Sequence, residues 1–164
     1  MNDAALAAIQ TTAFVLVGGL SLRCLAHERA PVARAILAAG LAAGGVMHVV
    51  QLIERGLLVS SDQPLAFNLF WTSLAVFDPL GALLLNVRPR AGIVLTLAIM
   101  VADVAINLSA FAHLGLFSPA SWRLWSQVIF ALFAIVAAPR VWAAAEGPEI
   151  RRGRRMKIKT SVKA

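Results

Sequence analysis

The sequence predicts an all-α membrane protein with five transmembrane helices, on three observations. The chain has 164 residues, is 60% hydrophobic and has a mean hydropathy of +0.80, well above the apolar fraction of soluble domains. Its apolar segments approach the about 20 residues that span a bilayer, and the polar connections between them are short. The five segments are residues 4–22, 32–53, 65–87, 92–112 and 120–141. We therefore expect one transmembrane domain over residues 1–145 and a basic tail over 146–164.

The distribution of positive charge predicts the orientation of these helices. Five spans put most of the cations on one side of the bilayer and only Arg55 and Arg123 on the other. The cations on the richer side are Arg23, Arg29, Arg34, Arg88, Arg90, Arg140 and the basic residues of the tail. By the positive-inside rule the N-terminus lies outside and the C-terminus in the cytoplasm.

The net charge of +7 favours a membrane surface over a nucleic acid as the partner of the tail. A basic cluster beside a transmembrane helix is attracted to anionic lipids, so we expect anionic lipid at the tail and no nucleic acid. Met1, Asn2 and Asp3 carry no basic region, so segment 4–22 is predicted to be a retained span. Arginines far outnumber lysines and alanine is abundant, which suggests a GC-rich genome. We therefore expect the membrane to be a bacterial inner membrane.

Segment 32–53 combines a close-packing face with a polar face. Gly40 and Gly44 form a GxxxG pattern, which lets helix backbones approach closely. His48, Gln51 and Glu54 follow at spacings of three, which places them on one slowly rotating face that can line a cavity. Two other interpretations stay open: a histidine satisfied by hydrogen bonds alone, and a solvated Glu54 at the membrane interface.

Segments 65–87 and 92–112 each carry one carboxylate near the middle of a span, Asp78 and Asp103. The linker between the segments is so short that the helices must be antiparallel neighbours, so both acids fall close to the bilayer midplane. A carboxylate there costs about 2.5–3.5 kcal/mol. We therefore expect both acids to face the protein interior and to be paired, protonated or functional. Pro79 should kink the helix beside Asp78.

A layer of polar side chains is predicted about one turn outside the two acids. Four segments contribute to it, with His48, Thr72, Asn107 and Gln127. Convergence of this kind is typical of a ligand cavity inside a helix bundle. The candidate catalytic residues are Asp78, Asp103 and His48, and the candidate ligand-binding residues are Gln51, Glu54, Trp71, Thr72, Asn107, Trp125 and Gln127. Trp71 can instead belong to the aromatic belt at the membrane interface.

The sequence indicates no cofactor and no metal site. It contains no CxxC, HExxH, GxSxG or P-loop motif, and no lysine at membrane depth for a Schiff base. His48 and His113 differ in depth by about 9 Å at 1.5 Å per residue, which is awkward for one haem.

Three short sequence motifs in the chain resemble motifs of the EXPERA superfamily, which includes the emopamil-binding sterol isomerase and the sigma-two receptor. Met47-His48-Val49-Val50 is similar to the family's second-helix histidine segment. Asp78-Pro79-Leu80 stands where the family has Gly-Pro-Leu, and Ala102-Asp103-Val104 resembles a fourth-helix Gly-Asp-Val. The family acid four residues after the histidine is replaced by Leu52.

The resemblance implies an amphipathic cavity open to lipid that binds sterol-like molecules or cationic amines. In the isomerase, a histidine and acids move a proton onto and off a carbon–carbon double bond. On this chain His48 and Asp103 would correspond to those groups.

Three functions stay open. The first is binding, or isomerisation by proton transfer, of a sterol- or isoprenoid-like molecule. Two adjacent carboxylates resist joint ionisation, so Asp78 and Asp103 would share a proton, with His48 as base. Thr72, Asn107 and Gln127 would then orient the ligand, and Trp71 and Trp125 would stack on it.

The second possible function is that of a small proton-coupled transporter, which would require a homodimer. The third is a non-catalytic subunit of a membrane complex.

Overall fold

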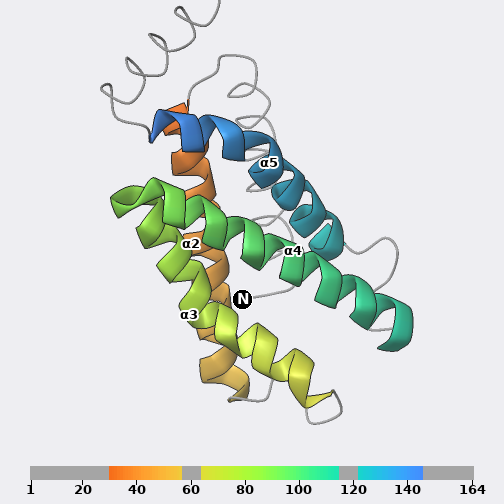
Figure 1. Cartoon of the computed structure of the whole chain (residues 1–164). Coiled ribbons are helices and arrows are strands. Elements are labelled where there is room, and N and C mark those ends of the chain that lie inside the picture. The colour runs from red at the N-terminus through yellow and green to blue at the C-terminus, as the bar shows by residue number, and fades with distance from the viewer. Residues whose placement is uncertain (1–29, 57–63, 115–121, 146–164) are drawn as a thin grey trace, which may run out of the picture.

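The computed structural model describes residues 30–56, 64–114 and 122–145, which form four α-helices (Figure 1). The helices are α2 (Ala30–Arg55), α3 (Leu65–Val87), α4 (Pro89–Leu114) and α5 (Trp122–Ala144). All four are long and apolar enough to cross a membrane. The all-helical class predicted from the sequence is therefore confirmed for this part of the chain, and the length and composition of its four helices fit the predicted membrane spans. The predicted first span and the basic tail lie outside the described residues.

The helix boundaries follow the predicted apolar segments closely. Helix α3 has the predicted bounds, and α2 and α4 extend slightly beyond theirs at both ends. Helix α4 begins at Pro89, a residue type suited to a first helical position because that position needs no amide donor. Helix α3 continues through Pro79, one residue after Asp78.

A very tight turn joins α3 and α4, with Arg88 alone between them. The Arg88 amide donates to the Leu84 carbonyl at 2.8 Å, and the Gly92 amide donates to the Arg88 carbonyl at 2.9 Å. A side chain at Gly92 would meet backbone atoms of the preceding helix, with its Cβ 2.5 Å from Leu85 Cα. Glycine thus permits the close approach of the two helices, which pack as the predicted antiparallel neighbours.

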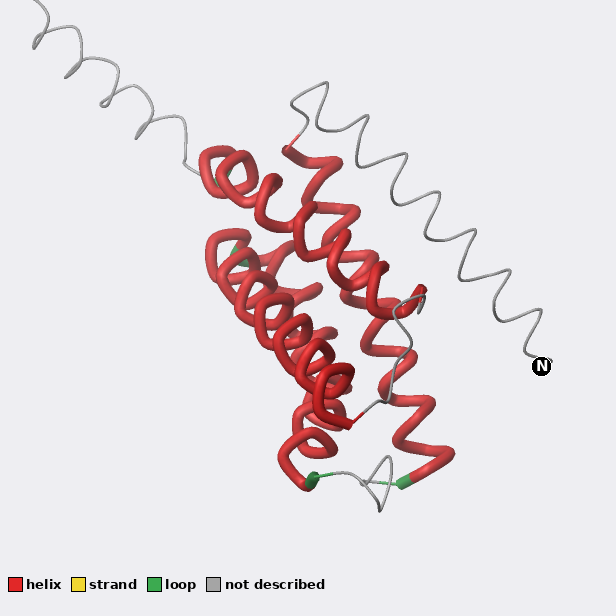
Figure 2. Tube along the Cα trace, turned by 90° about the vertical axis from the view of Figure 1, so that its right-hand side faces the viewer, coloured by secondary structure: helices red, strands yellow, loops and turns green. Residues whose placement is uncertain are grey.

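The four helices pack as a closed ring: α2 on α3, α3 on α4, α4 on α5, and α5 on α2. Figure 1 shows the α3–α4 hairpin in front of α2, and Figure 2 shows the same bundle from the side. Among the described residues α3 and α5 occupy opposite corners of the ring and share no contacts. Each pair of neighbours can therefore bring side chains from two helices to the bundle interior.

Apolar packing is concentrated at one end of this bundle. The largest fully buried apolar side chains are Leu37, Leu41, Leu85, Ile93 and Val141, and all lie between the level of Asp78 and the end that carries Arg34 and Arg88. We call this the basic end. Toward the opposite end, α2 has no buried residue after Gly45, and buried positions there include the amides of Asn68 and Asn107. The half of the bundle with more buried polar side chains is thus the half opposite the basic end, which the positive-inside rule predicts to lie away from the cytoplasm.

The glycines of α2 allow close packing against two different helices, α5 and α3. A Cβ at Gly40 would meet the ring of Phe130 on α5, whereas a Cβ at Gly44 would lie 2.7 Å from Asp78 Oδ2 on α3. Gly45 allows the closest approach to the Pro79 ring, whose Cδ would lie 2.6 Å from an added Cβ. The predicted GxxxG face is therefore a contact with both α5 and α3.

Gly45→Ala is expected to destabilise the protein, because the rigid Pro79 ring cannot move aside without shifting α3. Overpacking of this kind costs about 1–3 kcal/mol. The measurement is thermal unfolding in mild detergent, with Ala42→Leu as the control, since Ala42 is exposed on the same helix. Equal unfolding temperatures for the two variants would contradict the contact.

Candidate functional site

The candidate site is built around a buried hydrogen-bonded group on α4 and α5. Asp103 and Asn107 lie one helical turn apart and are 4% and 3% exposed. The Asn107 Nδ2 amide donates to Asp103 Oδ1 at 2.8 Å and to Gln127 Oε1 on α5 at 3.0 Å. The same nitrogen lies 2.9 Å from the Asp103 carbonyl oxygen. Asn107 therefore orients both the carboxylate and the glutamine, as the predicted polar layer requires.

Asp78 joins this group from α3. Its side chain is 4% exposed and lies on α3, which packs against the helix that carries Asp103. The absence of a side chain at Gly44 makes room for Asp78 Oδ2 against α2. The other oxygen, Oδ1, is buried and has no hydrogen-bond partner among the described residues. Asp78 thus offers an unsatisfied acceptor in the bundle interior.

His48 lies one turn beyond Gly44 on α2, on the face that packs against α3. It is half-buried, and its Nδ1 atom has no hydrogen-bond partner within the described part of the chain. Gln51, also half-buried, forms a side-chain hydrogen bond with His48. Glu54 is exposed near the end of the helix, as expected for a solvated carboxylate at the interface.

The remaining predicted residues, Trp71, Thr72 and Trp125, differ in how far they are buried. Trp71 is half-buried against the core and stacks on Phe67 with ring centroids 6.0 Å apart. Thr72 is half-buried on α3. Trp125 is 53% exposed on α5, so its ring lies largely on the outer surface of the described bundle. The structure therefore groups Asp78, Asp103, Asn107 and Gln127 and leaves Trp125 outside that group.

Two buried polar residues were not selected from the sequence. Asn68 on α3 is only 2% exposed and lies one turn before Trp71, a spacing that could have indicated a shared inward face. Thr96 on α4 is fully buried, and its hydroxyl donates to the Gly92 carbonyl at 2.8 Å. That bond satisfies the Thr96 hydroxyl within its own helix.

The site has the chemistry of a proton-sharing acceptor. In the residues that the structure describes, no group of three or more histidine, cysteine or acidic side chains could hold a metal ion. Two carboxyl groups in one apolar interior resist carrying two negative charges, which favours a shared proton. A hydroxyl or ammonium group of a ligand could donate to Asp78 Oδ1. The second buried atom without a partner among the described residues, His48 Nδ1, lies on α2 one turn after Gly44, the residue that faces Asp78.

Comparison of the chain with protein-family models, with curated proteins and with solved structures finds no match in any of the three.

Proposed function

We propose that this protein binds a hydrophobic, lipid-like small molecule at the buried polar group of Asp78, Asp103, Asn107 and Gln127. The observation that carries the proposal is the buried Asp78 Oδ1 atom without a partner among the described residues. A buried acceptor without a hydrogen bond costs about 1–3 kcal/mol, and a ligand that donates to it recovers this energy. A sterol or isoprenoid alcohol, or an amphiphilic amine, has both the donor and the apolar body that a membrane site requires.

Proton transfer is the reaction that this group supports best. A carboxylic acid at Asp78 or Asp103 could protonate a carbon–carbon double bond, and His48 could remove a proton from a neighbouring carbon, so that the double bond moves with no net change in composition. Asn107 would hold Asp103 in place through the 2.8 Å bond. The resemblance of the His48 and Asp103 segments to the EXPERA superfamily supports this isomerase chemistry.

A proton-coupled carrier is the second candidate, favoured by the burial of two acids in the middle of neighbouring apolar helices. Such a carrier would work as a homodimer, because one small chain offers little room for alternating access. As a non-catalytic subunit, the chain would instead place its aspartates against a cation of a partner protein.

We also propose the full membrane arrangement: five spans in a bacterial inner membrane, with the N-terminus outside and the C-terminus in the cytoplasm. Its support is the clustering of Arg34, Arg88, Arg90 and Arg140 at the basic end, while Arg55 lies at the opposite end of α2. Under the positive-inside rule the basic end faces the cytoplasm.

The test is native mass spectrometry of the full chain purified in mild detergent. Asp103→Asn keeps the oxygen that accepts from Asn107 but removes the charge. The matched control is Asn86→Asp, which makes the reverse exchange at an exposed position of α3. The proposal expects a discrete lipid-like mass on wild type and on the control, and much less of it on Asp103→Asn, because this variant lacks the carboxyl group that would share a proton with Asp78.

Other outcomes point to the other functions. A wild-type protein that carries no small molecule contradicts the binding site. Proton-linked flux in proteoliposomes that is lost in Asp103→Asn would then favour the carrier. A second protein chain released by Asp103→Asn would identify a subunit of a complex.

A further inference from the structure

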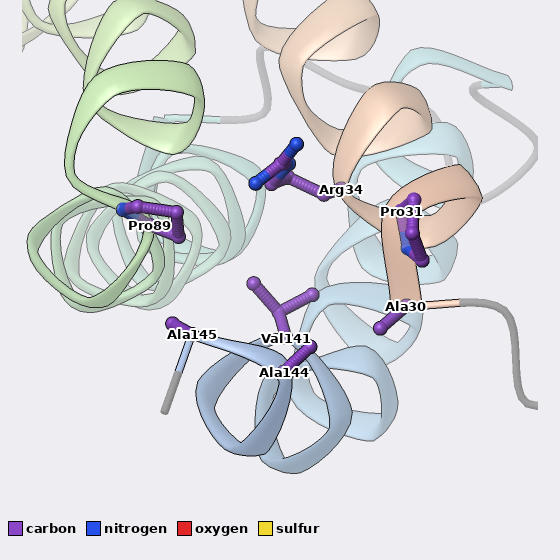
Figure 3. Close-up of a pocket in the computed structure, with 7 residues that line it drawn as sticks. All are labelled: Ala30, Pro31, Arg34, Pro89, Val141, Ala144 and Ala145. Atoms are coloured by element: carbon purple, nitrogen blue, oxygen red, sulfur yellow. The ribbon is translucent and has the colours of Figure 1, made fainter. Parts of the chain in front are cut away.

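A pocket of about 110 Å³ lies at the basic end of the bundle, far from the polar group of Asp78 and Asp103. It is formed by the first residues of α2 and α4 and the last turn of α5, and is lined by Ala30, Pro31, Arg34, Pro89, Val141, Ala144 and Ala145. Figure 3 shows the Arg34 side chain extending from α2 toward Pro89, above Val141. We call this the basic pocket.

Among the described residues that line the basic pocket, Arg34 is the one that carries a charge. It is half-buried and has no hydrogen-bond or ion-pair partner among the described residues. The acidic side chains that the structure describes are Glu54, Asp78 and Asp103, which lie at the bundle centre or at the opposite end. A guanidinium group presents several donors in one plane and matches an anionic oxygen pair, so the pocket is suited to an anion.

The pocket lies at the depth of lipid headgroups. Helices α2 and α4 have 26 residues each, and at 1.5 Å per residue they are about 39 Å long, more than the about 30 Å of hydrocarbon. Their ends therefore reach the interface. Trp142, beside the pocket residue Val141, is 43% exposed, and the Arg90 guanidinium carbon lies 5.3 Å from its ring centroid. An exposed tryptophan paired with a cation is typical of a membrane interface.

We propose that the basic pocket binds the phosphate of an anionic phospholipid, with Arg34 as the direct donor. Basic pockets between transmembrane helices are recognised sites for such headgroups. The cavity of about 110 Å³ exceeds the roughly 10–15 Å³ that one water molecule needs on this measure, so it can admit a phosphate group while the acyl chains stay on the outer faces of the helices. The N-termini of α2 and α4 add partial positive charge, of which the C-terminus of α5 offsets a part, so the charge of Arg34 is the main attraction for an anion. This site is independent of the proposed ligand at the two acids.

The test uses the full chain in nanodiscs of phosphatidylcholine mixed with phosphatidylglycerol, followed by native mass spectrometry of the lipids retained. Wild type should retain phosphatidylglycerol in preference to phosphatidylcholine. Arg34→Gln should lower this retention at least about tenfold, because it removes a charge-assisted hydrogen bond. Arg140→Gln removes the same charge at the same end but outside the pocket, and should cost about fivefold or less. All variants carry the same basic tail, so its contribution to phosphatidylglycerol retention is the same in each and does not affect the comparison.

A second variant tests the pocket without changing its charge. Ala144→Leu fills the space beside Val141 and should also lower phosphatidylglycerol retention, with an unfolding temperature close to that of wild type because Ala144 is exposed. Equal retention by wild type and Ala144→Leu, or equal losses in Arg34→Gln and Arg140→Gln, would overturn the site in favour of general surface charge. If inorganic phosphate in lipid-free detergent stabilises wild type but not Arg34→Gln, and wild type in nanodiscs shows no preference for phosphatidylglycerol, the lipid is overturned in favour of a soluble phosphate ligand.

Discussion

Asp78→Leu is expected to abolish retention of the lipid-like ligand while leaving the protein inserted and folded. Leucine has the same branching pattern as aspartate, so its methyl groups can take the places of the two oxygens beside Gly44. Exchanging a central aspartate for leucine favours membrane insertion by about 3 kcal/mol. The variant should therefore be at least as stable as wild type, and its loss of binding cannot be attributed to misfolding. A site that sacrifices stability for function behaves in this way.

The measurement combines native mass spectrometry with thermal unfolding in the same detergent. Asp78→Asn is the graded comparison, because it keeps one acceptor oxygen and loses the charge. The expected order of retained ligand is wild type, then Asp78→Asn, then Asp78→Leu. Ligand retention by Asp78→Leu at the wild-type level would rule out Asp78 as a binding group. A large fall in unfolding temperature would show instead that Asp78 is a structural residue.

Gly92→Ala is expected to have the largest effect on stability. The added Cβ would meet the backbone of the preceding helix, including Leu84 C at 2.6 Å and Leu85 Cα at 2.5 Å. Backbone atoms cannot rotate away as a side chain can, and Leu85 is fully buried. The tight turn between α3 and α4 would have to open, at a cost at or above the about 1–3 kcal/mol of ordinary overpacking.

The effect is measured by thermal unfolding, with Ala91→Leu as the control. Ala91 precedes Gly92 in the same turn but is exposed, so a larger side chain there should be tolerated. Because opening the hairpin would also separate Asp78 from Asp103, Gly92→Ala should reduce ligand retention as well. Wild-type stability of Gly92→Ala would mean that the two helices are not held together by this close approach.

Part of the site could be predicted because depth along a transmembrane helix follows directly from residue number. The short linker between segments 65–87 and 92–112 predicted that Asp78 and Asp103 lie at one level on neighbouring helices. The structure buries both acids on α3 and α4, which pack against each other. Of the predicted layer of His48, Thr72, Asn107 and Gln127, the structure joins Asn107 to Gln127 through a 3.0 Å hydrogen bond. Binding and catalysis by these residues stay predictions.

Rotation about the helix axis is much harder to predict from a membrane sequence. Apolar residues cover every side of α4, so its pattern does not distinguish a lipid-facing from an inward-facing side. Trp125 was predicted to line the site, yet its side chain is 53% exposed. Asn68 is deeply buried, although its distance along the chain from Asp78 gave no reason to select it.

The sequence by itself determined the helical class, the bounds of the described spans to within a few residues, and the depth of the two acids, because hydrophobic length and a constant rise per residue suffice for these. Only the tertiary structure decided which glycine faces which neighbour: Gly40 meets Phe130, whereas Gly44 and Gly45 meet Asp78 and Pro79. It also brought Arg34 between the ends of three helices. Such contacts join residues far apart in the chain, and they depend on packing that no local pattern records.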